Sequence, residues 1–298
     1  MLVLFDNNTA QRETLAKYLS ASPKHLAAIP HTVMEEWHMK KASQGVPDRL
    51  RIACQFPRQI VFLKNTAELM RMSGDSRGLL IRLIDRKQTR DFSAYCDTVI
   101  KAPMSEEIKA RFDDHEAYIA ETMAFLTEQS RKMMAVFRDW DENKDGNGFT
   151  AKELRELQGI LTRGEHLSAE LQRKTVIKAA AQAVNHFKRH GLDESKKPRD
   201  YPTLVNLLGF RYGAMMVAMY LVWKSSGSKS YPSKEQRVRS WINDLKIAAQ
   251  AAYLHGFKTD DGDLQKVYEI GRGIVSALGG YQDCGRFETW EQKVARLK

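Results

Sequence analysis

The stretch Trp241–Leu264, WINDLKIAAQAAYLHGFKTDDGDL, decides the fold prediction. Asp244 follows Asn243 at the start of an alanine-rich run, which predicts a helix, and the run HGFKT predicts a short strand. Three carboxylates follow this strand: Asp260, Asp261 and Asp263. Acids at a helix start and just past a strand end can converge in space, as a divalent-cation site requires. Taken alone, the same pattern is also typical of a solvated helix followed by an acidic turn.

The N-terminal end of the chain offers a further carboxylate. Residues Leu2 to Asn8 read LVLFDNN, an apolar run that ends in Asp6. This pattern predicts a buried strand that delivers a carboxylate at its carboxyl edge, where ligands of open α/β sheets collect. The next segment, Thr9–Leu19, is predicted to be helical because its apolar residues share one face.

A second apolar run, Leu26–Ile29, predicts another strand, and Pro30 closes it. The sequence HTVMEEWHMKK then predicts a helix that Thr32 caps, with Glu35 and Glu36 in its first turn. Acids in a first helical turn commonly do no more than compensate the helix dipole.

Taken together, these segments resemble the PIN-domain family of nucleases. FDNN stands where that family has Asp, a small polar residue and Asn. IPHTVMEEW resembles the second motif, with Glu36 as the preferred match and Glu35 as the alternative. NDLKIAA resembles the third motif, and KTDDGDL resembles the TrDxD turn, in which Asp260 replaces a commonly basic residue. The resemblance covers roughly residues 1–73 and 236–298.

The resemblance implies an α/β fold with a PIN-like parallel-sheet core, flanked by helices and interrupted by a mainly α-helical insertion at residues 74–235. It implies a metal-dependent endonuclease that acts on RNA rather than DNA, with toxins and defence effectors among the roles of the family. The implied catalytic residues are Asp6, Glu36, Asp244 and Asp261, and the implied metal ligands are these four and Asp263. We assign substrate contacts to Asn8, Asn243, Arg237 and Arg239.

The residues themselves also favour metal chemistry. Carboxylates without basic partners in their motifs repel one another unless cations bind between them. Mg²⁺ or Mn²⁺ accepts all-oxygen ligation, keeps several waters and binds substrate phosphate. We therefore expect these carboxylates to converge on one pocket that holds Mg²⁺ or Mn²⁺.

The charge of the chain suits a polyanionic partner. The formal net charge of +10 favours nucleic acid, although an acidic protein would also fit. The basic stretch from Lys224 to Arg239 leads directly into the Asp244 helix, and we predict that it forms one wall of the substrate path. A protein inhibitor is a further partner if the chain is a toxin, and the large helical insertion suggests a homo-oligomer as another.

The cysteines and the N-terminus favour a cytoplasmic protein. Cys54, Cys96 and Cys284 lie far apart with no metal-binding spacing, which fits a reducing compartment and no zinc site. The first strand begins at once, without the pattern of a signal peptide. The apolar run Leu207–Trp223 contains Arg211 and is short for a bilayer, so we predict a buried core helix and no membrane partner.

The middle of the chain, from Gly74 to Lys234, is predicted to be mainly helical. Within it, DENKDGNGFTAKELREL resembles the calcium loop of an EF-hand, but Glu153 is one residue out of register from either starting ligand. We instead predict a turn followed by a capping box of Thr150 and Glu153.

Two alternatives to a nuclease stay open from the sequence. The first is a catalytically inactive PIN-like module that binds nucleic acid or protein, which loss of motif acids would favour. The second is a calcium-responsive helical adaptor built around Asp141–Glu153, which the broken register of the loop disfavours.

Overall fold

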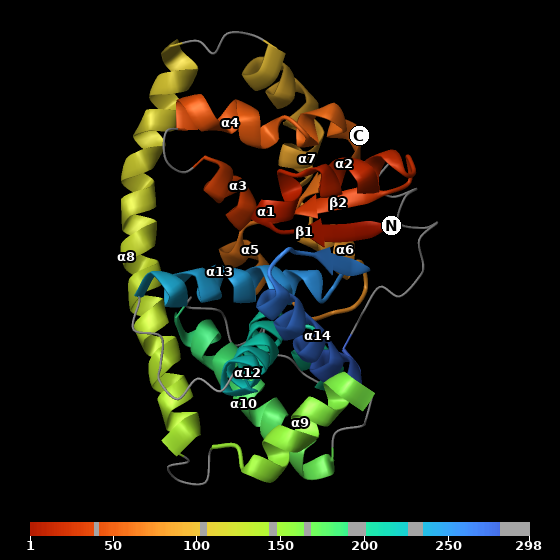
Figure 1. The fold of residues 1–298 in the computed structure, drawn as a ribbon, viewed down its shortest axis with the longest axis vertical. Coiled ribbons are helices and arrows are strands. Elements are labelled where there is room, and N and C mark those ends of the chain that lie inside the picture. The colour runs from red at the N-terminus through yellow and green to blue at the C-terminus, as the bar shows by residue number, and fades with distance from the viewer. Residues whose placement is uncertain are drawn as a thin grey trace.

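The computed structural model describes residues 1–38, 42–101, 106–142, 148–163, 168–189, 201–225 and 235–280. Figure 1 shows an elongated molecule with a small sheet near the middle and helices on both sides of it along the long axis.

Four parallel strands form the sheet, in the order β3-β2-β1-β4. Their bounds are Leu2–Phe5 for β1, Leu26–Ile29 for β2, Ile60–Phe62 for β3 and Gly256–Lys258 for β4. Every residue of β1, β2 and β3 is buried, as expected for parallel strands that are covered on both faces. The predicted α/β class with a parallel sheet is therefore confirmed, and β3 is an additional strand that the sequence analysis did not single out.

Strand register places the two ends of the chain side by side. Val3 of β1 pairs with Ala27 on one side and with Gly256 on the other. β1 and β4 are thus neighbours although more than 250 positions separate Val3 from Gly256 in the sequence. Because the strands are parallel, Asp6 after β1 and Thr259 after β4 emerge at the same edge of the sheet.

Short helices follow the strands around this edge. The helices up to α7 are α1 (Asn7–Ala10), α2 (Glu13–Ser20), α3 (His31–Trp37), α4 (Ala42–Leu50), α5 (Thr66–Met70), α6 (Leu79–Leu83) and α7 (Arg86–Cys96), with 3₁₀ turns η1 (Ala53–Gln55) and η2 (Pro57–Gln59) and a π turn η3 (Asp97–Lys101).

Two local predictions in this region were wrong. The segment Thr9–Leu19 does not form one helix, because α1 ends at Ala10 and α2 begins at Glu13. Thr32 does not cap α3; Pro30 occupies the N-cap position, and Thr32 is buried within the helix. A proline there is suited to a helix start because its fixed φ fits the boundary and it has no amide hydrogen to satisfy.

The chain stays on the sheet beyond β3. The amide of Asp85 donates to the carbonyl of Phe62 at 2.9 Å, and the amide of Lys64 donates to the carbonyl of Leu83 at 2.9 Å. The amide of Phe62 donates to Thr89 Oγ1 at 3.0 Å. The domain boundary predicted near residue 74 stays a sequence prediction. These hydrogen bonds join residues 62–64, which precede that boundary, to residues 83–89, which follow it.

Every described element between β3 and β4 is helical. The later helices are α8 (Glu106–Glu142), α9 (Ala151–Arg163), α10 (Ala169–Arg189), α11 (Tyr201–Val205), α12 (Leu208–Ser225), α13 (Glu235–Ala251) and α14 (Gly262–Ala277). In Figure 1, α8 runs along one side of the molecule, and α13 lies between the sheet and the group formed by α9, α10 and α12.

Helix α12 forms the centre of the helical part. It packs against α10, α13 and α14, and its residues from Leu208 to Trp223 are almost all buried. The prediction of a buried core helix is therefore confirmed. Among the described helices, none combines the length and the apolar character needed to cross a membrane.

The predicted capping box is confirmed at the start of α9. The amide of Thr150 donates to Glu153 Oε2 at 2.6 Å, and the amide of Glu153 donates to Thr150 Oγ1 at 3.2 Å. Lys174 of α10 pairs with the same carboxylate at 2.8 Å. Glu153 is therefore already occupied by protein groups, whereas residues 143–147 of the suggested calcium loop lie outside the described residues.

A disulfide joins Cys54 of η1 to Cys96 at the end of α7. The two cysteines are 42 positions apart in the sequence, and the fold brings η1 and the end of α7 together. Disulfides are typical of oxidising compartments, so these two cysteines do not support a reducing one. The cytoplasmic location stays a prediction.

Close packing of α10 on α12 leads to a stability prediction. A Cβ added at Gly213 of α12 would lie 2.7 Å from Ala179 Cα and 2.8 Å from its carbonyl oxygen, both backbone atoms of α10. We expect Gly213→Ala to lower the free energy of unfolding by about 1–3 kcal/mol, because the helices must move apart. Urea-induced unfolding would measure this loss.

Gly262→Ala is the matched control for that measurement. Gly262 lies in the first turn of α14, and an added Cβ there meets nothing within 4 Å. This substitution should leave stability unchanged or raise it slightly, because alanine is the better helix former. Equal effects of the two variants would contradict the close-packing argument.

Candidate functional site

Asp6 is fixed at the carboxyl edge of β1. It is 5% exposed and caps α1, where its Oδ1 accepts hydrogen bonds from the amide of Thr9 at 2.8 Å and from Thr9 Oγ1 at 2.6 Å. Thr259 Oγ1, just past β4, donates to the other oxygen, Oδ2. Both carboxylate oxygens are therefore oriented by side chains of the two neighbouring strand ends.

Thr259 also links Asp6 to the start of α14. Its Oγ1 accepts a hydrogen bond from the amide of Asp261 at 3.0 Å. Asp261 then caps α14, accepting from the amides of Asp263 at 2.8 Å and Leu264 at 3.0 Å. The Thr259 hydroxyl thus joins the Asp6 carboxylate to the backbone amide of Asp261, the residue that caps α14.

Asp244 lies at a different position in its helix than the sequence suggested. It lies well inside α13, which begins at Glu235, and not at a helix start. Burial raises the pKa of its carboxyl to about 8, and repulsion by other carboxylates adds to that rise. The repelling groups, in order of effect, are Asp261, Glu36 and Asp6.

The Asp244 carboxylate has no compensating contact. Within the part of the chain that the structure describes, it accepts no hydrogen bond and forms no ion pair. A partly buried carboxylate normally finds donors, so Asp244 differs in this respect from Asp6 and Asp261. Its environment favours either a bound proton or a bound cation.

Glu36 of α3 completes the group. Burial raises the pKa of its carboxyl to about 7, and repulsion by Asp6 and Glu35 contributes. Hydrogen bonds from Asn243 and Asn7 oppose the rise, and Asn243 Nδ2 lies 3.5 Å from Glu36 Oε1. Glu36, the preferred match of the two glutamates, is thus the one whose charge interacts with those of Asp6 and Asp244.

Of the two asparagines predicted to contact substrate, Asn243 and Asn8, only Asn243 lies at the carboxylates. Asn243 points to Glu36, as an orienting residue would. Asn8 is exposed on α1, with no hydrogen bond among the described residues, whereas its neighbour Asn7 contacts Glu36. The structure therefore brings Asn7 to the carboxylates, a residue that we had not assigned.

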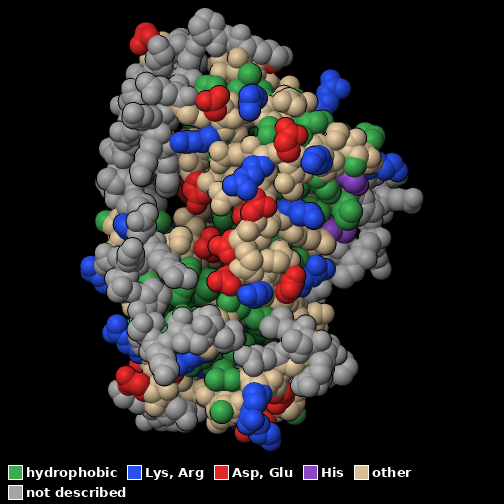
Figure 2. Space-filling model, viewed as in Figure 1, with side chains coloured by type: hydrophobic (Ala, Val, Ile, Leu, Met, Phe, Trp, Pro, Cys, Tyr) green, Lys and Arg blue, Asp and Glu red, His purple; other side chains and the backbone are tan. Residues whose placement is uncertain are grey.

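Four carboxylates from three parts of the chain therefore influence one another: Asp6, Glu36, Asp244 and Asp261. Figure 2 shows acidic side chains gathered in the middle of one face, with Lys and Arg side chains beside them. As placed, no three His, Cys, Asp or Glu side chains of the described residues are close enough to enclose one metal ion. The carboxylates share an electrostatic environment but do not form a closed ligand cage.

The other two acids of the DDGD turn lie at the rim. Asp263 is mostly exposed, and its Oδ1 lies 3.3 Å from Lys266 Nζ. Asp260 pairs with Arg12 at 2.6 Å between two exposed side chains. Asp263 keeps an edge position, whereas Asp260 is engaged by a cation of the segment between α1 and α2.

Protein groups engage much of the basic stretch before α13 that is described. Lys224 pairs with Asp141 of α8. Arg239 is partly buried in α13, and its NH1 lies 3.4 Å from Thr127 Oγ1 of α8. The side chain of Arg237 lies outside the described residues, as do residues 226–234. The predicted substrate wall is therefore not a row of free cations at Lys224 and Arg239.

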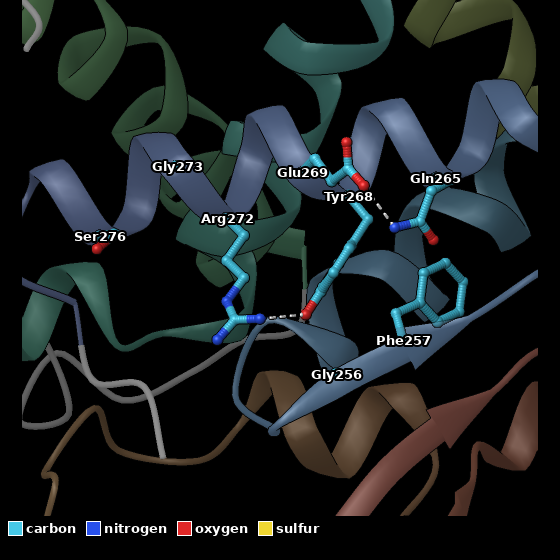
Figure 3. Close-up of a pocket in the computed structure, with 8 residues that line it drawn as sticks. All are labelled: Gly256, Phe257, Gln265, Tyr268, Glu269, Arg272, Gly273 and Ser276. Carbon is cyan, nitrogen blue, oxygen red and sulfur yellow. Dashed lines mark hydrogen bonds between the residues drawn. The ribbon is translucent and has the colours of Figure 1, made fainter. Parts of the chain in front are cut away.

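A cavity between β4 and α14 lies apart from these acids (Figure 3). Glu269 is its only carboxylate, and Gln265 donates to that carboxylate at 2.7 Å. Arg272 points to the Tyr268 hydroxyl at 2.9 Å. Neutral side chains thus engage both charged groups of the cavity, and none of the predicted site carboxylates lines it.

Three residues near the acids were missed by sequence reasoning. Thr9 and Thr259 orient Asp6, and Asn7 contacts Glu36. The hydroxyl directly after β4 and the one in the short helix that follows β1 were a usable signal, since side chains at that edge face one site. Comparisons with protein-family models, curated proteins and solved structures gave no match.

Proposed function

We propose that this chain is a PIN-like endonuclease that hydrolyses phosphodiester bonds in RNA with the help of Mg²⁺ or Mn²⁺. The observation that carries the proposal is the Asp244 carboxylate, which has no partner among the described residues and is repelled by three other carboxylates. Repulsion of this kind costs stability unless a cation binds. Perturbed acids in one site are typical of functional centres.

The donor set fits a hard divalent cation. Carboxylates of Asp6, Glu36, Asp244 and Asp261 and amides of Asn7 and Asn243 offer only oxygen ligands. Mg²⁺ prefers oxygen, keeps several waters and commonly uses one or two protein carboxylates directly. A spread carboxylate group suits such partly hydrated binding better than it suits a closed cage.

When bound, the cation would lower the pKa of a coordinated water and stabilise the charge that develops on the phosphate. Asp6 is held in one orientation by Thr9 and Thr259, so it needs little rearrangement to act as a ligand. Asn243 and Asn7 orient Glu36. Because the pKa of Asp244 is raised to about 8 and that of Glu36 to about 7, a cation would compete with protons for these two carboxylates.

RNA is the proposed substrate because the PIN resemblance implies it, and the charge of +10 suits any nucleic acid. A protein inhibitor would be a further partner if the chain acts as a toxin. A cleavage experiment distinguishes these possibilities, because it shows whether the chain cuts RNA, DNA or neither.

Cleavage assays test the proposal directly. The full chain would be incubated with end-labelled single-stranded RNA and with DNA of the same sequence, each with Mn²⁺, Mg²⁺ or a chelator. We expect internal cuts in RNA that require the metal. Cutting of DNA alone would change the substrate class. Binding without any cutting would favour the inactive module, and cutting that survives the chelator would contradict metal dependence.

A further inference from the structure

Groups from two other helices hold the carboxyl end of α3, where Glu36 lies. Arg49 of α4 donates from NH1 to the carbonyl of Trp37 at 2.6 Å, and the same nitrogen lies 3.5 Å from the carbonyl oxygen of Glu36. The Tyr95 hydroxyl of α7 lies 2.6 Å from Nε2 of His38, the C-cap residue of α3. The last carbonyls of a helix have no partner within it, so α4 and α7 together fix the end of α3.

The disulfide joins these two supports to each other. Cys96 directly follows Tyr95 in α7, and Cys54 lies in η1, shortly after Arg49 of α4. α7 is itself attached to β3 by a hydrogen bond at Thr89. The bond therefore ties the segment that follows α4 to a helix that the sheet holds in place.

The position of Glu36 depends on these supports more than that of Asp6 does. Asp6 accepts hydrogen bonds from the hydroxyls of Thr9 and Thr259. Glu36 Oε1 lies 3.5 Å from Asn243 Nδ2, at the long limit of hydrogen bonding. Glu36 is therefore a carboxylate whose place follows that of its helix.

The disulfide is open to thiol exchange from the side of Cys54, which is partly exposed, whereas Cys96 is 4% exposed. A thiolate of a dithiol reductant attacks Cys54 Sγ, and Cys96 leaves as a thiolate. The second thiol of the reductant then attacks the mixed disulfide and releases Cys54. Two electrons and two protons pass to the protein, and the dithiol becomes a disulfide. Exposed disulfides are the ones that commonly serve in regulation.

We propose that the Cys54–Cys96 disulfide is a redox switch for the carboxylate site. In the oxidised form it holds the end of α3, and with it Glu36, beside the other carboxylates. Reduction separates the two supports and lets the end of α3 move, so the site binds a cation less tightly. The inference rests on the proposed function, because it adds regulation to the same cation site.

Fluorine NMR tests the movement of α3 without requiring metal or turnover. Of the five tryptophans, Trp37 is the buried residue next to Glu36, whereas Trp140 and Trp223 lie in α8 and α12. In protein labelled with 5-fluorotryptophan, Trp→Phe variants assign these three signals. We expect dithiothreitol to shift or broaden the Trp37 signal and to leave the other two unchanged, and reoxidation should restore it. An unchanged Trp37 signal in fully reduced protein would overturn the switch, as would a change of all three, which indicates general unfolding.

Mn²⁺ affinity, measured by calorimetry, tests whether the movement reaches the site. The double variant Cys54→Ala with Cys96→Ala represents the open form, and its Kd should be about tenfold higher than that of the oxidised wild type, as loss of one charged contact would cause. With Glu36→Gln in both backgrounds, the two Kd values should be equal, because the effect runs through Glu36.

Tyr95→Phe is the second variant, since it keeps the disulfide and removes the hydroxyl that contacts His38. Its oxidised form should bind Mn²⁺ more weakly than the oxidised wild type, and opening the disulfide should change its Kd less. Equal Kd values for the oxidised wild type and the double cysteine variant would overturn control of the site. Absence of Mn²⁺ binding by the oxidised wild type would instead overturn the proposed function, and the Trp37 signal would still show whether the disulfide holds α3.

Discussion

Asp244→Asn is expected to abolish RNA cleavage while the fold persists. The substitution keeps the shape of the side chain but removes the charge that a cation would bind. Metal stabilisation of the transition state is worth several kcal/mol, so the rate should fall on the order of 10³-fold. Initial rates with Mn²⁺, measured beside Mn²⁺ affinity, would show whether binding and cleavage are lost together.

The same substitution should stabilise the cation-free protein, with a clear pH dependence. The pKa of Asp244 is raised to about 8 in the folded chain. Between an unfolded pKa of about 4 and pH 8, the folded state binds more protons than the unfolded state, so this group costs stability as the pH rises. Asp244→Asn removes a cost on the order of a few kcal/mol at pH 8 and a much smaller one at pH 5.

Thermal unfolding in chelator at pH 5 and pH 8 would measure this difference, and Mn²⁺ should stabilise the wild type more than the variant. Asp260→Asn is the control, because Asp260 is exposed and paired with Arg12. It removes the same charge from the same region and should keep wild-type cleavage. A variant Asp244→Asn that cleaves normally would remove Asp244 from the mechanism, and one that melts earlier at pH 8 would assign it a structural role.

Local sequence patterns predicted the strand ends well but not the helix boundaries. The run LVLFD contained an apolar strand and its terminal acid, and the T-x-D-x-D turn contained the cap of α14. The start of α13 could not be placed, because EQRVRSW carries no clear cap and helical periodicity extends through it. Asp244 was therefore assigned to a helix start although it lies well inside the helix.

Long-range features were beyond the sequence pattern. The spacing of Cys54 and Cys96 gives no signal, and only the path of the chain around β3 brings them within bonding distance. Whether a basic side chain is engaged by another protein group also depends on the tertiary fold. Arg239 contacts α8, and Arg12 pairs with Asp260. A charge run indicates that cations are present, but it does not show which of them are free.

Loss of the Cys54–Cys96 disulfide is expected to destabilise the sheet region strongly. The bond closes a loop with a sequence separation of 42, which contains β3, α5, α6 and α7. Chain entropy released in the unfolded state predicts a loss of about 4 kcal/mol, with 2–4 kcal/mol typical of measured cases. The midpoint of urea-induced unfolding should therefore fall when a thiol reductant is added.

A double variant, Cys54→Ala with Cys96→Ala, separates the bond from other effects of the reductant. It should unfold at a lower urea concentration than the oxidised wild type and should not respond to the reductant. Cys284→Ala should still respond as the wild type does. The loss should also reach α3, because the Tyr95 hydroxyl beside Cys96 lies 2.6 Å from His38 Nε2 at the end of α3. Faster amide exchange in α7 and α3 of the double variant would show this coupling, and an unchanged urea midpoint would contradict a stabilising role for the bond.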